Sequence, residues 1–394
     1  MRIVHIITRM IVGGAQENTR FNCLDLVREH GDDVTLITGP SVGAEGKLLE
    51  QSNDRDLKVV QVPSLMRSIR PHVDLRGYRD LKRILGQLRP DVVHTHSAKA
   101  GILGRAAAWK LQIPCVIHTV HGAPFHPYQH ATARWFFQAC ERWAAKRCHR
   151  MISVADAMTD LMVQAEVAPR DKFTTIYSGM DVEPFLKSDE SRDAIRHQLG
   201  IKPEHVVIGK IARLFHLKGH EYLFEAARSL VAEHPSVRFL LVGDGILRSE
   251  MEQQLRRLNL RDRFIFTGLV SPERIPSLVG AMDILVHVSL REGLARAIPQ
   301  GLIAGKPVVS YDVDGAREVV LDGETGYLLP PKSIAPLAGA LSRLIVDPEL
   351  RSRLGQNGRL RFTDRFRHQS MTRRIRAVYE AVLLEDSPPI ANRH

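Results

Sequence analysis

Short runs of β-branched and other apolar residues alternate with longer amphipathic stretches along almost the whole chain. The apolar runs contain few polar residues, so they predict strands buried on both faces, as in a parallel sheet covered by helices. In the first half the expected strands are 3–7, 34–38, 59–62, 92–96, 115–120, 151–154 and 174–177. Expected helices between them include 16–29, 75–88, 99–111 and 134–146. The alternation therefore favours an α/β fold with doubly wound parallel sheets.

A second series of strands is expected after residue 205, at 206–211, 239–242, 264–267, 284–288, 307–310 and 326–329. The segment 178–202 between the two series carries Gly179, Pro184 and a charged stretch, and we interpret it as an interdomain connection. The pattern thus predicts two Rossmann-like domains, residues 1–180 and 190–366. A ligand cleft is expected where the carboxyl ends of their strands face each other.

Composition agrees with a soluble globular protein. The chain has 394 residues, of which 44% are apolar and 25% charged, and this length suggests two or three domains. Its four scattered cysteines are too few for a disulfide framework or a paired-cysteine zinc site, so reduced thiols and a cytoplasmic location are expected. The apolar start is too short for a signal peptide, and no apolar run approaches the ~18 residues that span a bilayer.

The net charge of +11 is concentrated in one region. Residues 61–150 contain 15 Lys and Arg against 4 Asp and Glu, and residues 351–376 contain nine Arg against one acid. Such an excess suits nucleic acid, an anionic membrane or phosphorylated substrates, or it serves solubility alone. No nucleic-acid recognition motif accompanies it, so we expect no nucleic-acid partner.

Two glycines, Gly13 and Gly14, stand between the first expected strand and helix. Glycines there allow a ligand to approach the backbone, and the following helix N-terminus attracts phosphate. The spacing is not G-x-G-x-x-G, which argues against a dinucleotide site. The turn itself also needs small residues, so both a binding role and a purely structural one stay open.

In the second half, Arg213 follows a strand and Lys218 lies where the next helix is expected to begin. Two cations beside free backbone N–H groups form a suitable clamp for a diphosphate. The alternative is an exposed loop with two solvated cations.

The segment after strand 284–288 carries Glu292 at the strand tip, followed by Gly293, Leu294 and Ala295. A carboxylate in this place suits sugar hydroxyls, although it would also suit a helix N-cap. Gln300 lies eight residues after Glu292, so we expect both on one face of one helix and within reach of one ligand.

These motifs, in their order and spacing, resemble the retaining family 4 glycosyltransferases (group 1) of GT-B fold, in the branch that builds polysaccharides and lipid-linked glycans. The resemblance covers nearly the whole chain. It rests on Gly13–Ala15, Val120–Gly122, Ile176–Asp181, Arg213 with Lys218–Gly219, Val242–Gly245, Phe266–Gly268, Glu292–Leu294 and Gly305–Val309.

The resemblance implies a role for each matching residue. The donor diphosphate would bind Arg213 and Lys218, the transferred sugar would bind Glu292, and His121 would lie near the donor sugar and the acceptor. Further donor contacts would come from Gly13, Gly14, Gly293, Leu294, Ala295, Arg296 and Gln300. It also implies that a C-terminal helix, residues 367–385, packs back on the first domain.

The sequence departs from the family at two of these positions. Gln300 replaces the second glutamate of the E-x7-E motif, and an amide binds ribose hydroxyls without charge assistance. This puts donor affinity or nucleotide preference in doubt. Ala295 is followed by Arg296, which is either an added phosphate or acceptor contact or a solvated residue.

Histidines gather at 118, 121, 126 and 130, with His94 and His96 on the preceding strand, and Asp312 and Asp314 form a D-x-D pattern. No thiolate or carboxylate set accompanies the histidines at zinc-site spacing, so we favour a polar acceptor-cleft loop over a zinc site. The aspartates follow a strand where the family has a glycine-rich turn, and we interpret them as a turn feature. We therefore expect no metal and no other cofactor.

The expected reaction moves a sugar from a nucleoside-diphosphate donor to a glycan or lipid-linked acceptor, with retention of configuration. Whether the donor carries UDP or GDP, and which sugar moves, stays open. Alternatives are a nucleotide-sugar 2-epimerase of the same fold and a catalytically weak nucleotide-sugar-binding protein. The basic face suggests peripheral attachment to the inner face of the plasma membrane, with 65–88 as first candidate contact.

Overall fold

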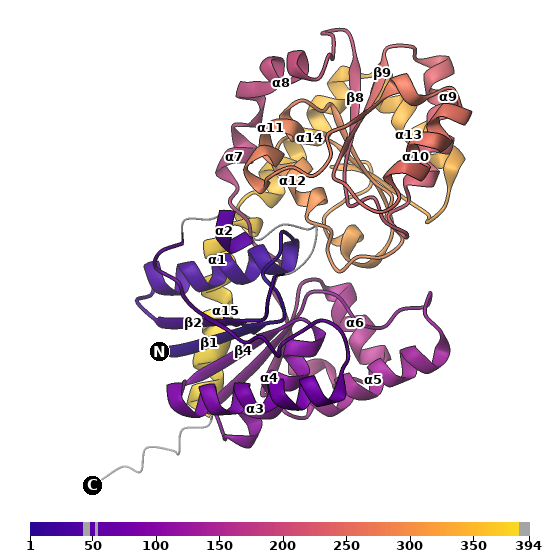
Figure 1. Ribbon diagram of the computed structural model, residues 1–394. Coiled ribbons are helices and arrows are strands. Elements are labelled where there is room, and N and C mark those ends of the chain that lie inside the picture. Colours follow the sequence, from indigo (N-terminus) through magenta and orange to yellow (C-terminus); the bar gives the residue numbers. More distant parts are fainter. Residues whose placement is uncertain (42–47, 52–53, 386–394) are drawn as a thin grey trace. The chain divides into compact units, whose positions relative to one another are not determined.

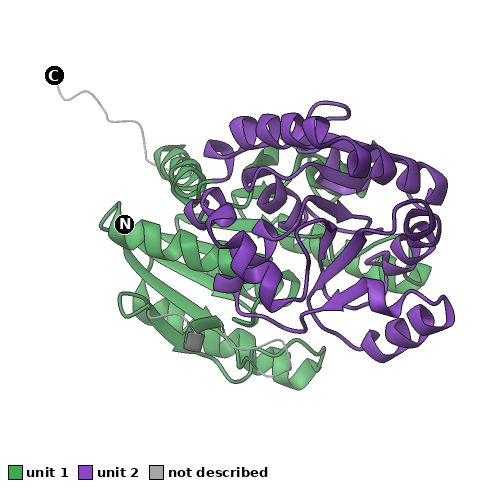
Figure 2. Cartoon of the chain, turned by 90° about the horizontal axis from the view of Figure 1, so that it is seen from above, with its two compact units in different colours: residues 1–180, 367–394 green, residues 181–366 purple. Residues whose placement is uncertain are grey.

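The computed structural model describes residues 1–41, 48–51 and 54–385, and these form two compact units. Unit 1 comprises residues 1–180 together with the C-terminal segment that begins at Arg367 (Figure 2). Unit 2 comprises Asp181–Phe366. The chain therefore leaves unit 1 after Met180 and returns to it at Arg367.

Unit 1 is built on a seven-stranded parallel sheet in the order β3-β2-β1-β4-β5-β6-β7 (Figure 1). Its strands are β1 (Arg2–Ile7), β2 (Asp33–Thr38), β3 (Lys58–Gln61), β4 (Val92–His96), β5 (Cys115–Val120), β6 (Arg150–Ser153) and β7 (Phe173–Thr175). Both β4 and β5 have the predicted bounds, because their β-branched runs are buried throughout. The edge strand β3 is largely exposed, contrary to the expectation of two buried faces.

Helices cover both faces of this sheet. One face packs against α1 (Gly14–Arg28) and α15 (His368–Glu385), and the other against α4 (Ala98–Lys110), which α3 (Pro71–Leu88) and α5 (Ala131–Ala145) flank (Figure 1). The short α2 (Leu48–Gln51) and α6 (Asp156–Gln164) complete the unit.

The C-terminal helix α15 is fixed to α1 by polar contacts as well as by packing. Asp25 of α1 accepts hydrogen bonds from His368 Nδ1 (2.8 Å) and from Thr372 Oγ1 (2.9 Å). Arg376 Nε donates to the buried Asp32 over 3.0 Å. Buried apolar side chains of α15, among them Ile375, pack into the same core as Ile3 of β1. The last described helix is thus part of unit 1.

Unit 2 is built on a six-stranded parallel sheet in the order β10-β9-β8-β11-β12-β13. Its strands are β8 (Val206–Ile211), β9 (Val237–Val242), β10 (Phe264–Phe266), β11 (Ile284–His287), β12 (Val308–Tyr311) and β13 (Gly326–Leu329). Its helices are α7 (Glu183–Leu186), α8 (Arg192–Gln198), α9 (His220–Glu233), α10 (Arg248–Arg257), α11 (Ile275–Gly280), α12 (Ala297–Ile303), α13 (Ile334–Val346) and α14 (Pro348–Phe362).

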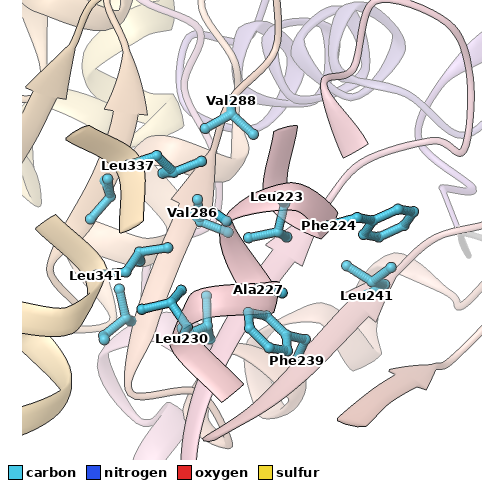
Figure 3. Packing of buried hydrophobic residues seen from close by; sticks show 14 of the residues in the cluster. Leu223, Phe224, Ala227, Leu230, Phe239, Leu241, Val286, Val288, Leu337 and Leu341 are labelled. Atoms are coloured by element: carbon cyan, nitrogen blue, oxygen red, sulfur yellow. The ribbon is translucent and has the colours of Figure 1, made fainter. Parts of the chain in front are cut away.

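The core of unit 2 lies between this sheet and the pair α9 and α13. Figure 3 shows Leu223 and Leu230 of α9 beside Val286 of β11 and Leu341 of α13. Such a layer of buried apolar side chains sets the position of α9, whose first turn follows the predicted phosphate clamp.

The two parallel sheets with interleaved helices confirm the predicted α/β class. The segment 178–202 contains the passage from unit 1 to unit 2, at Met180–Asp181, but most of it is helical and packed within unit 2. Arg192 and Arg196 bind the two carboxylate oxygens of Asp283 at 2.5 and 2.6 Å. Glycine, proline and charge in that stretch therefore accompany short helices as well as the passage between the units.

Candidate active site

The centre of the site in unit 2 is an ion pair between Lys218 and Glu292. Lys218 Nζ lies 2.5 Å from Glu292 Oε1, and both side chains are mostly shielded from solvent. Lys218 precedes α9, and Glu292 lies in the loop between β11 and α12. The two motifs that the sequence separates by more than seventy residues thus meet at the carboxyl ends of adjacent strands, β8 and β11.

A close approach of two backbone segments holds Lys218 in place. Gly219 has φ +67°, and a Cβ atom there would lie 1.8 Å from the carbonyl oxygen of Val288. The amide of Leu290 donates to the carbonyl of Leu217 over 2.8 Å, joining the same two segments. Only glycine fits this position, so the Lys-Gly pair is required by the geometry of the loop.

Two further groups set the state and direction of Glu292. His287 Nε2, at the end of β11, lies 3.3 Å from Glu292 Oε1. Asp314 Oδ2 accepts the backbone N–H of Glu292 over 2.6 Å. Burial alone would raise the pKa of Glu292, but Lys218 and His287 outweigh burial and hold that pKa well below its usual range. Glu292 is therefore an ionised acceptor of hydrogen bonds.

The expectation that Glu292 and Gln300 share one helix face was wrong. The helix α12 begins only at Ala297, so Glu292 lies five residues before it, in the loop that follows β11. Gln300 is in the middle of this short helix, whose remaining residues are largely buried. Lys218 holds the Glu292 carboxylate and Asp314 holds the Glu292 backbone N–H, both outside the helix, and spacing alone could not show this.

The other predicted donor residues lie on the same loops. Arg213 follows β8 by two residues; its carbonyl accepts from His220 Nε2 (3.1 Å) and its guanidinium lies over the Phe215 ring. The carbonyl of Gly293 accepts the N–H of Gly315 over 3.1 Å. Leu294, Ala295 and Arg296 continue the loop to α12.

The predicted residues of unit 1 lie at the carboxyl ends of its central strands. Gly13 precedes α1, which begins at Gly14. Nearby, Thr8 at the end of β1 exchanges a 2.8 Å hydrogen bond with Ser97 at the end of β4. Ser97 has φ 61° and ψ 158°, a conformation that is strained for any residue except glycine and is typical of functional sites.

His121 follows β5 and ends a chain of hydrogen-bonded histidines. His121 Nε2 lies 3.0 Å from His96 Nδ1, and His96 Nε2 lies 2.9 Å from His5 Nδ1. Next to them His94 bonds the hydroxyls of Tyr379 (2.5 Å) and Thr119 (2.6 Å). Burial lowers the pKa of His94 and His96 well below 6.5, so these two imidazoles are neutral.

The predicted acceptor-cleft loop does not include His118, which lies in β5, whereas His94 and His96 lie on the preceding strand β4, as expected. These three are buried in β4 and β5, where the apolar run around them predicts strand but not the direction of the side chain. His5, His94 and His96 form the one group of metal-ligand type among the described residues, with ligand atoms within 4.8 Å of one another. Both nitrogens of His94, however, already bond hydroxyl groups.

The D-x-D residues are both engaged by protein groups. Asp312 accepts two hydrogen bonds from Arg317, at 2.9 and 2.5 Å, and Asp314 accepts from the backbone of Glu292. Both aspartates thus fix the loop after β12, which agrees with the interpretation of the D-x-D pattern as a turn feature. Asp314 therefore supports the site through Glu292.

Three residues of this site escaped the sequence analysis: His287, Asp314 in its contact with Glu292, and Lys210. His287 and Lys210 lie inside strands, and both are buried. The sequence does contain a signal for Lys210, because it is the one charged residue in the otherwise apolar strand Val206–Ile211.

Two family models match the chain and together span most of it. Residues 12–184 match Glycosyltransferase Family 4, and residues 191–361 match Glycosyl transferases group 1. The chain is 28% identical over 382 residues to the UDP-Gal:alpha-D-GlcNAc-diphosphoundecaprenol alpha-1,3-galactosyltransferase of Escherichia coli, covering 96% of each chain. It is 30% identical over 301 residues to the putative glycosyltransferase EpsD of Bacillus subtilis, covering 74% and 77%.

Solved structures give the same fold. The HepE protein of Anabaena in complex with UDP-glucose superposes with a TM-score of 0.80 at 24% identity, covering 97% of this chain and 100% of that one. WaaG, a glycosyltransferase involved in lipopolysaccharide biosynthesis, gives 0.76 at 19% identity, covering 96% and 99%. The chain is an enzyme that belongs to the family 4 (group 1) glycosyltransferases of GT-B fold.

Proposed function

We propose that this enzyme transfers a sugar from a nucleoside-diphosphate donor to a glycan or lipid-linked acceptor of surface-polysaccharide assembly, with retention of anomeric configuration. The Lys218–Glu292 pair carries this proposal, because one ammonium and one carboxylate meet at the ends of adjacent parallel strands, where such folds bind ligands. Among relatives, the E. coli enzyme named above acts on a diphosphoundecaprenol-linked sugar, and HepE was solved with UDP-glucose.

The chemistry follows from the charges of these two side chains. Cleavage of the donor bond places negative charge on the leaving diphosphate while the sugar gains oxocarbenium character. Lys218, together with Arg213, stabilises that negative charge, and a buried, preorganised cation does so more strongly than water. Glu292, freed from Lys218, accepts hydroxyls of the transferred sugar. Gly293, Leu294, Ala295, Arg296 and Gln300 complete the proposed donor side.

No metal is part of the proposal. The carboxylates of the D-x-D pattern already bond Arg317 and the backbone of Glu292. The charge of the leaving group is stabilised by Lys218 and Arg213 instead of by a metal ion. Unit 1 provides the acceptor side, with Gly13, Gly14 and His121 at the ends of its strands.

A transfer assay with a panel of UDP- and GDP-sugars and a polyprenyl-diphosphate-linked acceptor tests the function. We expect product in the presence of EDTA, with the anomeric configuration of the donor when read by NMR. Lys218→Ala should lower turnover on the order of 10² to 10³-fold. Lys332→Ala, a lysine elsewhere in unit 2, is the matched control.

Three results would contradict parts of this proposal. Turnover of the nucleotide sugar without acceptor, giving an epimer, would point to the 2-epimerase class. Full activity of a folded Lys218→Ala variant would remove Lys218 from its role. Binding of nucleotide sugar without transfer to any acceptor would indicate a binding protein.

We also propose that unit 1 docks on anionic lipid. No helix among the described residues is long and apolar enough to cross a membrane. The surface instead carries exposed aromatic side chains on α4 and α5: Trp109, Trp135, Phe136 and Trp143, which we call the aromatic patch. Tryptophan favours the membrane–water interface.

Basic and apolar groups surround the aromatic patch. The guanidinium of Arg147 lies 3.7 Å from the centre of the Trp143 ring. A cavity of about 530 Å³ between α3, α4 and α5 is lined by Trp109, Trp143 and the exposed Leu75. The segment 65–88 named from the sequence therefore contributes one edge of this surface, and α5 contributes its most exposed aromatic residues.

A further inference from the structure

Lys210 is a lysine inside the core of unit 2, and the proposed mechanism does not use it. It lies near the carboxyl end of β8, in register with Leu241 of β9. Its side chain is on the same face of the sheet as Ile208, toward the apolar core under α9, where Figure 3 shows Leu241 of β9 and Val286 of β11. Only 1% of the residue is exposed, and Nζ has no hydrogen-bond partner among the described residues.

An ammonium group in such a place is costly. Removal of a charge from water without a partner is avoided in proteins, and the group instead loses its proton. Burial and the neighbouring Lys218 lower the pKa of Lys210 to about 7. The nearby α9 begins at His220, and the positive end of its dipole also disfavours a cation.

Charged and titratable groups from every neighbouring element face Lys210. They are Lys218 in the loop before α9, His220 and Glu221 in its first turn, His287 at the end of β11, and Glu292 in the loop that follows. Burial lowers the pKa of both histidines, so they are neutral at physiological pH. The Lys218 charge is balanced by Glu292 while no ligand is bound. Lys210 is therefore buried close to the Lys218–Glu292 pair, which is the proposed diphosphate site.

We propose that Lys210 is a third cation of the donor site, uncharged while the site is empty and protonated from solvent when a nucleoside diphosphate binds. The inference rests on the proposed function of this site. An incoming diphosphate brings at least two negative charges and draws Lys218 away from Glu292, so both anions then face the buried amine. Coulomb attraction in a shielded site favours the ammonium form, and one proton moves from water to Nζ.

In this arrangement the site gains a positive charge only when a nucleoside diphosphate is bound. A permanently charged lysine would repel Lys218 in the empty enzyme, whereas a neutral amine does not. After the donor bond breaks, the leaving diphosphate carries further negative charge, and the buried ammonium of Lys210 stabilises that charge. Lys210 acts on the donor through the local field and is a positioning residue, because nothing places it in contact with the ligand.

Calorimetric titration of the full-length protein with UDP at about pH 8, in HEPES and in Tris, tests the inference. The phosphates of UDP are fully ionised there, so a dependence of the heat on buffer reports protons bound by the protein. We expect the wild type to take up close to ~1 proton per UDP, and Lys210→Met to take up none. UDP affinity of that variant near pH 7 should fall on the order of tenfold.

Lys306→Met is the matched control. Lys306 is another buried lysine of unit 2, but its Nζ bonds Asp189 Oδ1 at 2.6 Å, away from the site. This control should keep the wild-type proton uptake. Equal uptake by wild type and Lys210→Met, or no uptake by the wild type, would overturn the inference.

Two further measurements keep the inference open to refutation. If Lys210→Met does not fold, lysine-selective ¹³C NMR of the wild type replaces it: a lysine that titrates near pH 7 must stay protonated to about pH 8 with UDP bound, and its failure to do so overturns the inference. GDP is titrated in parallel. Absence of binding by both nucleotides would contradict the proposed donor function itself, whereas binding without Lys210-dependent uptake contradicts this inference alone.

Discussion

At the scale of single residues, the site is a small set of charges whose states depend on one another. Lys218 and Glu292 neutralise each other at 2.5 Å, Asp314 fixes the Glu292 backbone, and His287 Nε2 lies 3.3 Å from Glu292 Oε1. The motif residues Lys218 and Glu292 could be named from the sequence, because their types and spacing are tied to ligand chemistry. His287 and Lys210 could not be named from the sequence, since strand periodicity does not reveal which buried position lies beside the site.

Lys210 should also affect the stability of the free enzyme. Its pKa of about 7 in the folded protein lies below the 10.5 of an exposed lysine, so the unfolded chain binds more protons between these values. The free energy of unfolding must therefore rise with pH across that interval and stay low below it. Lys210→Met removes this dependence.

We expect Lys210→Met to be more stable than the wild type, with the larger gain at acid pH. Between about pH 6.5 and 9 the difference in the free energy of unfolding should shrink by about 2 to 3 kcal/mol, since each pKa unit corresponds to about 1.4 kcal/mol. Urea unfolding of both proteins at the two pH values measures it. A difference that is independent of pH would show that Lys210 is not titrating in this range.

At the scale of elements, the sequence predicted strands better than the segments around them. Strand β8 has the predicted bounds because an apolar, β-branched run of that length has few alternatives. The start of α12 was misjudged, since Glu292 and Gly293 resemble a helix start but are held by Lys218 and Gly315. The short helices within 178–202 were not predicted either, because long-range contacts such as that of Arg192 with Asp283 hold them in place.

The junction between α4 and α5 contains a buried ion pair. Arg105 Nη2 lies 2.8 Å from Glu141 Oε2, both side chains are essentially without solvent contact, and Arg105 Nε donates to the carbonyl of Gly101. Such a pair contributes little by itself, but removal of one partner leaves the other charge uncompensated in the core.

Glu141→Gln should therefore lower the free energy of unfolding by about 3 to 5 kcal/mol. A double variant, Arg105→Met with Glu141→Met, should recover most of that loss because it buries no charge. Chemical denaturation of the three proteins makes the comparison. If the single variant were as stable as the wild type, the pair would not be buried as described.

At the scale of the whole molecule, we expect the basic excess behind the charge of +11 to serve the proposed docking of unit 1 on anionic lipid. Many of the basic residues already have acidic partners: Lys99 pairs with Asp74, Arg150 with Glu385 and Arg376 with Asp32. The sequence located the basic excess but not the aromatic patch, because the exposure of Trp135 and Trp143 depends on which face of α5 packs against α4.

We expect the protein to sediment with vesicles that contain anionic lipid and not with neutral vesicles. Trp135→Ser with Phe136→Ser should abolish this binding, since Trp135 is 66% exposed and its loss leaves the core intact. Ile246→Ser, which removes an exposed apolar side chain of unit 2, is the control. Equal binding to neutral and anionic vesicles would refute docking on anionic lipid.

The return of the chain to unit 1 at Arg367 determines the order in which the molecule can be completed during synthesis. The ribosome finishes unit 2 before it makes α15, so unit 2 can fold while unit 1 still lacks its last helix. Until then Asp25 and His94 have no α15 side chains to bond, and the apolar face around Ile3 stays open. The nascent first unit is thus the part of this enzyme that most needs protection from aggregation.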